Sequence, residues 1–167
     1  DRDAGSITAL EIMRALREIG FKVTFVPCSN FAWLPPYSEL LAALGIESII
    51  FPWAKSLSAH LSRFGLHYDS VLIFRPRTWH DCIDIIKAKA PQARVIYHAS
   101  DLHFLREERE RLLAEKAGQE PAGHKLESSK QAELNIVSTA DLCIVHSRSE
   151  QDLLQERTVK FNDFNRY

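Results

Sequence analysis

The side chains best suited to chemistry follow a short apolar run at residues 94–97. His98, Asp101 and His103 stand close together in the segment YHASDLHF. An imidazole titrates near neutral pH and a carboxylate can orient it, so His98 or His103 paired with Asp101 could act as a general base that activates a hydroxyl. The alternative is that Asp101 caps the following helix and that both histidines are exposed loop residues.

A second polar group follows the apolar run at residues 70–74. Arg75 and Arg77 each carry a planar guanidinium, which can hold an anion through two parallel hydrogen bonds. His80 lies a little further on, at the start of the expected helix. The alternative is an ordinary polar loop in which Arg77 is solvated and Trp79 packs against the core.

A third group opens the chain, in the sequence DRDAGS. Gly5 and Ser6 precede a stretch of helical period, and the free N–H groups at a helix N-terminus can receive a phosphate. The single glycine does not match the Gly-x-Gly-x-x-Gly dinucleotide fingerprint, and no Gly-Lys-Ser/Thr loop is present. The alternative is that Ser6 only caps the helix.

The elements that must position these groups alternate between short β-rich runs and stretches of helical period. We expect strands at 21–27, 46–51, 70–74, 94–97 and 141–145, and helices at 6–18, 37–44, 53–64, 79–88, 102–116 and 124–137. Strands separated by helices predict a mostly parallel sheet with helices on both faces, in an α/β, Rossmann-like three-layer domain. The last three strands are apolar enough to be buried on both faces.

The limits of this domain are set by the same pattern. Residues 1–156 form the predicted domain, and residues 157–167 show no clear period and stay unassigned. The chain begins in the turn that normally follows a first strand, so we expect that strand to be missing. Apolar residues along the resulting sheet edge could support a homodimer.

Composition excludes several classes of protein. With 167 residues, 46% hydrophobic and 26% charged, the chain fits one globular domain. A formal charge of −1 argues against a general nucleic-acid surface. The three cysteines are widely spaced and form no zinc or Cys-x-x-Cys pattern, which favours a reducing, cytoplasmic setting and no metal site. The sequence contains no apolar run long enough to span a bilayer and no signal segment.

The charged stretch at 102–116 is expected to be a solvated helix face. Opposite charges stand four residues apart, Arg106 with Glu110 and Glu107 with Arg111. Such pairs stabilise a helix by a few tenths of a kcal/mol each and do not indicate nucleic-acid binding.

Four segments together resemble a known family. They are residues 1–27, residues 37–46 (YSELLAALGI), residues 95–110 (VIYHASDLHFLREERE) and residues 141–154 (DLCIVHSRSEQDLL). They are similar to the amino-terminal, acceptor-side domain of GT-B fold glycosyltransferases of the family 4-like group, which build bacterial surface polysaccharides. The resemblance extends from residue 1 to about residue 155, and DLHFLREERE is its most specific part.

This resemblance implies a division of labour. Asp3, Gly5 and Ser6 match the loop that borders the donor phosphates and the acceptor, and residues 97–103 match the segment with an acceptor-side histidine or aspartate. The acceptor would be a sugar or a lipid-linked molecule. The donor, a nucleoside-diphosphate sugar, would be held by a carboxy-terminal domain that this sequence lacks, so the chain alone should not transfer a sugar. Asp101 or His103 is favoured as the base, and His98 is the next candidate.

Two other functions remain open at this point. A non-catalytic flavodoxin-like or receiver-like binding module would share the fold, but a receiver needs an acidic cluster where Arg75, His98 and His146 stand. A dinucleotide enzyme such as a sugar-nucleotide epimerase is opposed by the single glycine of the opening turn. For the transferase, we expect a cytoplasmic location, either free or peripheral at the inner face of the membrane.

Overall fold

The computed structural model describes residues 4–99, 102–118 and 126–158, with the side chains of 103 and 126–128 outside that description. The chain divides into two compact units. Unit 1 comprises Asp1–Asp69 and His80–Ala93, and unit 2 comprises Ser70–Trp79 and Arg94–Tyr167. Within the described ranges, no helix combines the length and the apolar character needed to cross a membrane.

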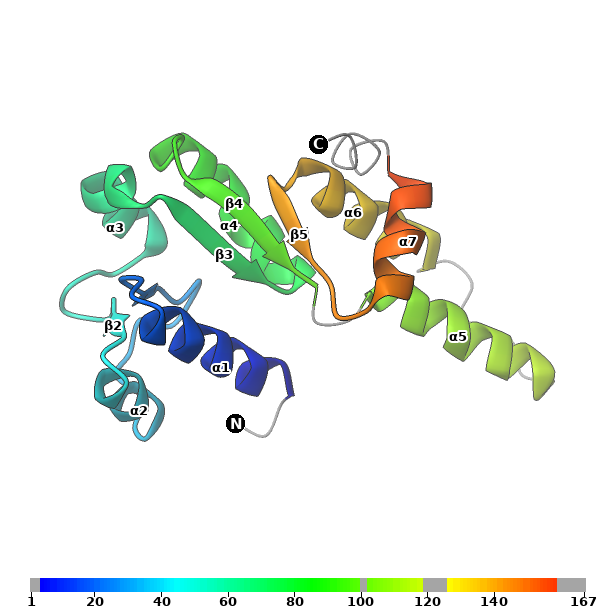
Figure 1. Ribbon diagram of the computed structural model, residues 1–167, viewed down its shortest axis with the longest axis horizontal. Coiled ribbons are helices and arrows are strands. Elements are labelled where there is room, and N and C mark those ends of the chain that lie inside the picture. The colour runs from blue at the N-terminus through cyan, green and yellow to red at the C-terminus, as the bar shows by residue number, and fades with distance from the viewer. Residues whose placement is uncertain (1–3, 100–101, 119–125, 159–167) are drawn as a thin grey trace. The chain divides into compact units, whose positions relative to one another are not determined.

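Unit 1 is mostly helical and contains a small parallel sheet (Figure 1). Its elements are α1 (Ala4–Glu18), β1 (Thr24–Phe25), α2 (Tyr37–Ala43), β2 (Glu47–Ser48), α3 (Leu57–Phe64), a 3-10 turn η1 (Gly65–His67) and most of α4 (Pro76–Lys89). Thr24 pairs with Glu47 and Phe25 with Ser48. The parallel pairing agrees with the prediction, since a helix lies between the two strands.

The helix ends of unit 1 follow from a few residues. Gly20 and Gly45 take positive φ values of 97° and 69°, which suit the residue that ends a helix, and they follow α1 and α2. Ser56 caps α3 by accepting a hydrogen bond from the Ala59 N–H at 3.1 Å. The predicted cap at Ser6 is wrong, because α1 already begins at Ala4 and Ser6 lies within its first turn.

The two strands of unit 1 are much shorter than the predicted strands 21–27 and 46–51. Each apolar run is followed by a proline, Pro27 or Pro52, and proline has no N–H to donate to a ladder. Only the middle of each run pairs. The apolar runs therefore predict where the two strands lie but overestimate their length.

Gly65 is placed where no side chain fits. A Cβ built on it would lie 2.1 Å from the carbonyl oxygen of Lys89, at the end of α4. The Gln92 amide closes the same junction by donating to the carbonyls of Gly65 and Tyr68, each at 2.9 Å. The chain after α3 therefore touches the chain around the end of α4 backbone to backbone, which only glycine permits.

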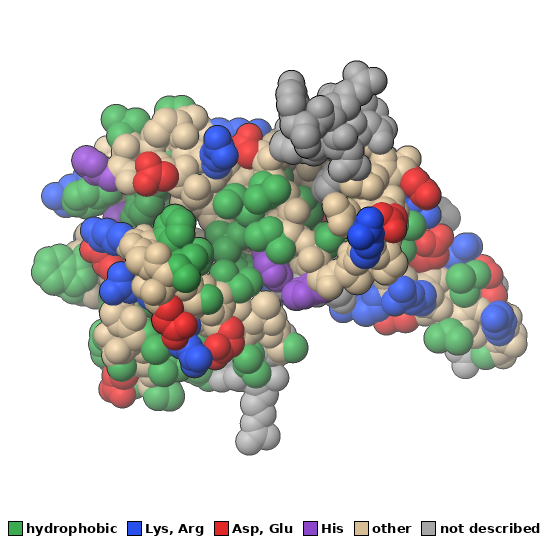
Figure 2. Space-filling view, viewed as in Figure 1, with side chains coloured by type: hydrophobic (Ala, Val, Ile, Leu, Met, Phe, Trp, Pro, Cys, Tyr) green, Lys and Arg blue, Asp and Glu red, His purple; other side chains and the backbone are tan. Residues whose placement is uncertain are grey.

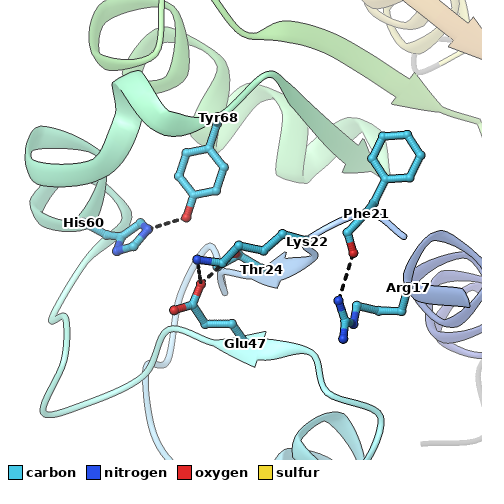
Figure 3. A network of polar contacts seen from close by, with 7 residues as sticks. All are labelled: Arg17, Phe21, Lys22, Thr24, Glu47, His60 and Tyr68. Carbon is cyan, nitrogen blue, oxygen red and sulfur yellow. Dashed lines mark hydrogen bonds and ion pairs between the residues drawn. The ribbon is translucent and has the colours of Figure 1, made fainter. Parts of the chain in front are cut away.

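A polar network links the sheet of unit 1 to α3 (Figure 3). Glu47 accepts a hydrogen bond from the Thr24 hydroxyl at 2.8 Å and lies 3.7 Å from the Lys22 ammonium. Beside it, His60 Nε2 and the Tyr68 hydroxyl are 2.6 Å apart. Burial raises the pKa of Tyr68 and lowers the pKa of His60, so this pair is neutral at physiological pH.

Many apolar side chains of unit 1 stay exposed. In the view of Figure 2, hydrophobic side chains reach the surface around α2. The exposed set includes Trp33 and Leu34 of the loop before α2, Tyr37 at the start of α2, and Phe51 and Trp53 of the loop before α3. These two loops meet where the Phe51 N–H donates to the Phe31 carbonyl at 2.7 Å.

Unit 2 contains the larger sheet (Figure 1). Its strands are β3 (Ser70–Phe74), β4 (Arg94–His98) and β5 (Leu142–Ile144), in the order β3-β4-β5 and all parallel. Its helices are α5 (His103–Lys116), α6 (Leu126–Thr139) and α7 (Arg148–Arg157). The α/β class and the parallel pairing of these strands are confirmed.

The three strands are not equally buried. β4 is central and carries Tyr97 and His98, both almost fully buried. On β5, Leu142 is 50% exposed and Ile144 37% exposed, so the prediction of burial on both faces is wrong for this strand. The reason is its place at the edge of the order β3-β4-β5, where β4 is its one partner within the described sheet.

The helices of unit 2 confirm one charge prediction and add a helix. Arg106 lies 3.9 Å from Glu110 on exposed α5, as expected of a solvated face, whereas Glu107 accepts a hydrogen bond from Ser129 of α6. Helix α7 was not predicted. Ser147 and Glu150 form a complete capping box at its start.

Candidate functional site

The candidate site lies at the carboxyl end of the sheet in unit 2. Phe74 pairs with His98 and His98 with Ile144, so β3, β4 and β5 all end at the same level. The carboxyl ends of parallel strands are where α/β proteins bind ligands. The segments that follow β3, β4 and β5 therefore all begin at the carboxyl end of this sheet.

Three rings form a row across this edge. The His98 ring lies between those of Phe74, at a centroid distance of 4.9 Å, and His146, at 5.0 Å. His98 and His146 meet edge to face, with an interplanar angle of 77°. We call Phe74, His98 and His146 the ring row.

His98 is the most unusual member of the ring row. Its side chain is 2% exposed, and its Nδ1 has no hydrogen-bond partner among the described residues. Burial lowers the pKa of His98, the nearby His146 lowers it further, and a contact with its own backbone opposes the shift in part. The imidazole is therefore neutral at physiological pH, the form that can accept a proton.

His146 is held in place through its backbone. The Glu150 carboxylate accepts hydrogen bonds from the N–H groups of His146 and Ser147, both at 3.1 Å. The Ala99 N–H donates to the Ile144 carbonyl at 3.0 Å, which continues the pairing just past β4. The exposed His146 imidazole is thus fixed beside the buried His98 imidazole by two short segments that follow β4 and β5.

The loop after β3 is shaped by Arg75. Its φ of 72° is rare for a residue other than glycine, and such conformations cluster at functional sites. Proline follows at the first position of α4, which suits its fixed φ. Helix α4 therefore starts three residues before the predicted Trp79, and Arg77 lies in its first turn instead of a loop.

The predicted site residues fall into three groups. His98, Arg75 and Arg77 belong to the carboxyl end of the unit 2 sheet or the turn after it, whereas Gly5 and Ser6 lie in the first turn of α1 in unit 1. His103 is the first residue of α5, and its side chain is outside the description. Asp3 and Asp101 lie outside the described residues.

Two residues of the ring row, Phe74 and His146, were not among the predicted site residues. His146 follows β5 as His98 ends β4, and its position after a strand was the available signal. Its contact with His98 depends on the register of two strands more than 40 residues apart, as in the pairing of Tyr97 with Cys143. Register of this kind is not readable from either segment alone.

Within the part of the chain that the structure describes, no group of three or more histidine, cysteine, aspartate or glutamate side chains is arranged to hold a metal ion.

Comparison with known proteins gave no match to a family model, to a curated protein or to a solved structure. The structure shows an α/β chain with two small parallel sheets, and the larger sheet carries His98 at its carboxyl end.

Proposed function

We propose that the carboxyl end of the sheet β3-β4-β5 binds a ligand hydroxyl, and that the chain is the acceptor-side domain of a nucleotide-sugar-dependent glycosyltransferase. The products would be surface polysaccharides or other glycoconjugates. The parallel α/β layout is compatible with the Rossmann-like domain of such enzymes. The sequence resemblance over residues 95–110 and 141–154, which flank this edge, supplies the choice of activity.

The single observation that carries the proposal is the buried His98, whose Nδ1 has no hydrogen-bond partner among the described residues. A buried polar atom without a partner costs about 1–3 kcal/mol, so it needs a reason. A partner supplied by a ligand hydroxyl is one reason, and the Asp101 carboxylate expected to orient an imidazole is another. Both belong to the same chemistry, because an oriented neutral imidazole is a general base.

In the proposed reaction, the acceptor hydroxyl attacks the anomeric carbon of the donor. The new bond joins the acceptor oxygen to that carbon, the bond from the carbon to the diphosphate breaks, and the hydroxyl proton passes to a base in the segment 97–103. His98, Asp101 and His103 remain the three candidates for that base. Arg75, which follows β3, and Arg77, in the first turn of α4, would supply positive charge toward the leaving group or the acceptor.

The test uses the complete protein that the gene encodes. It is incubated with nucleoside-diphosphate sugars and an array of glycan and lipid-linked acceptors, and acceptor-dependent release of nucleoside diphosphate is measured. We expect release from the complete protein and none from residues 1–167 alone. Glycan binding without release by the complete protein would instead identify a binding module and overturn the transferase proposal.

Variants then separate the candidate bases. His98→Gln should lower transfer by about 100-fold or more if His98 takes the proton, because general-base catalysis contributes on that scale. Asp101→Asn should have a similar effect if the carboxylate orients that imidazole. The matched control is His67→Gln, an exposed histidine of η1 in unit 1, which should leave transfer unchanged.

A further inference from the structure

Two cysteines far apart in the sequence meet in unit 1. The Sγ atoms of Cys28, in the loop after β1, and Cys82, in α4, are 2.7 Å apart, and both thiols are free. The residues are 54 positions apart, and both belong to unit 1. A disulfide has a sulfur–sulfur distance of about 2.05 Å, so about 0.7 Å of approach separates the two thiols from a bond.

We infer that Cys28 and Cys82 form a reversible disulfide, and so constitute an oxidation site that ties the loop after β1 to α4. The inference does not depend on the proposed function. It rests on the contact between the two sulfur atoms and on the different exposure of the two thiols.

That difference in exposure sets the order of events. Cys82 is 4% exposed, whereas Cys28 is partly exposed, so an oxidant from solution meets Cys28 first. Burial and the neighbouring Cys28 raise the pKa of Cys82 to about 12, so Cys82 carries little thiolate while both thiols are reduced. Conversion of Cys28 to a mixed disulfide removes its contribution to this shift, while burial remains.

The chemistry balances with glutathione disulfide as the oxidant. The Cys28 sulfur attacks one glutathione sulfur, which releases one glutathione and forms a mixed disulfide. The Cys82 sulfur then attacks the Cys28 sulfur, which breaks the bond to the second glutathione and forms the Cys28–Cys82 disulfide. The two protons lost by the cysteines end on the two released glutathione thiols. Reduced glutathione in excess reverses both steps.

Cys143 provides a matched control. It lies on β5 in unit 2, it is a free thiol, and burial raises its pKa to about 12 as well. It therefore resembles Cys82 in its ionisation but is not paired with another sulfur among the described residues. A difference between Cys82 and Cys143 in the experiment reports the neighbouring Cys28.

The experiment equilibrates the full chain with mixtures of oxidised and reduced glutathione, quenches with acid, and alkylates the free thiols under denaturing conditions. Intact mass and peptide mapping then count the thiols. We expect the wild-type chain to lose two of its three alkylatable cysteines, with a peptide crosslinked through Cys28 and Cys82, and to regain both in excess reduced glutathione.

The variants make the result decisive. Cys82→Ala should stop at a glutathione adduct on Cys28, Cys28→Ser should keep both remaining thiols, and Cys143→Ser should behave as the wild type. A wild-type chain that keeps three thiols, stops at a glutathione adduct, or crosslinks through Cys143 would overturn the inference. Because the readout is thiol count, this outcome is independent of any sugar transfer.

Discussion

Among the residues whose side chains are described, each unit contains one buried histidine, and the two differ in the hydrogen bonds that their nitrogens make. His60 in unit 1 is 5% exposed and His98 in unit 2 is 2% exposed, and burial lowers the pKa of both. His60 shares a 2.6 Å hydrogen bond with Tyr68, whereas His98 leaves Nδ1 without a partner among the described residues. Burial alone therefore does not mark a site. His98 differs from His60 in having a buried nitrogen with no partner among the described residues, at the carboxyl end of parallel strands, where α/β proteins bind ligands.

The two ends of strand β4 differ in a similar way. At the start of β4, the Val95 N–H donates to the Asp141 carboxylate at 2.7 Å, and the Asp141 N–H donates to the Val95 carbonyl at 2.9 Å. At the other end of β4 stands His98. At the first end, a charged hydrogen bond fixes β5 against β4. At the other end, the His98 Nδ1 has no partner among the described residues.

The largest effect on stability is expected at the first end of β4. Asp141→Ala should lower the free energy of unfolding by about 2–3 kcal/mol, because it removes a charged acceptor from a backbone N–H. Urea unfolding followed by circular dichroism measures this loss. Asp141→Asn, which keeps an acceptor oxygen, should lose less; equal losses would mean that the charge is unimportant.

The two histidines themselves are compared by the same substitution. His60→Phe should cost about 1–2 kcal/mol, because it keeps a ring but removes the hydrogen bond between His60 and the Tyr68 hydroxyl. His98→Phe should be close to neutral or stabilise by up to about 1 kcal/mol, because it removes a buried nitrogen that has no partner among the described residues. Hydrogen exchange with mass spectrometry assigns each change to its unit, and equal losses would erase the distinction between the two sites.

A smaller effect is expected from the other half of the His60 pair. Tyr68→Phe should lower the free energy of unfolding by about 1 kcal/mol, the usual net value of one hydrogen bond. The double variant with His60→Phe should lose less than the sum of the two single losses, since both partners are then apolar. Additive losses in this double-mutant cycle would show that the two rings are not coupled.

The smallest effect concerns pH and applies to both histidines. Their folded pKa values lie below the unfolded value of about 6.5, so the unfolded chain binds more protons near that pH. Their contribution to stability is complete above about pH 6.5 and is lost as the pH falls through it toward the folded pKa values. His60→Phe and His98→Phe should each flatten the slope of unfolding free energy between about pH 7.5 and pH 5.5, and an unchanged slope would contradict this.

Much of the fold follows from local pattern. The runs SVLIF and RVIY predict β3 and β4 within one residue of their observed ends. Short, almost continuously apolar runs between polar residues are typical of buried parallel strands. Helix α7 was not predicted, although Ser147 and Glu150 stand at the spacing of a capping box, which indicates the start of a helix.

The site was less predictable than the fold. His98 was identified because it follows an apolar run, but its burial against Phe74 and His146 depends on long-range strand register. The early start of α4 depends on a positive φ at Arg75, for which the residue type gives no local signal. The ring contacts of His98 and the start of α4 could not be predicted, because the first depends on tertiary strand pairing and the second on an unusual backbone conformation.

Gly65 and Gln92 have a practical use in the search for relatives. A Cβ at position 65 would lie 2.1 Å from a backbone oxygen, so any chain that makes this junction needs glycine there. An amide side chain 27 positions later holds the two carbonyls of the junction, those of Gly65 and Tyr68. A search for relatives can therefore require a glycine and an amide residue 27 positions apart, with an apolar strand and a helix between them. A comparison of overall sequence similarity does not apply this requirement. Diverged chains that keep both residues would be the first candidates to align with this one.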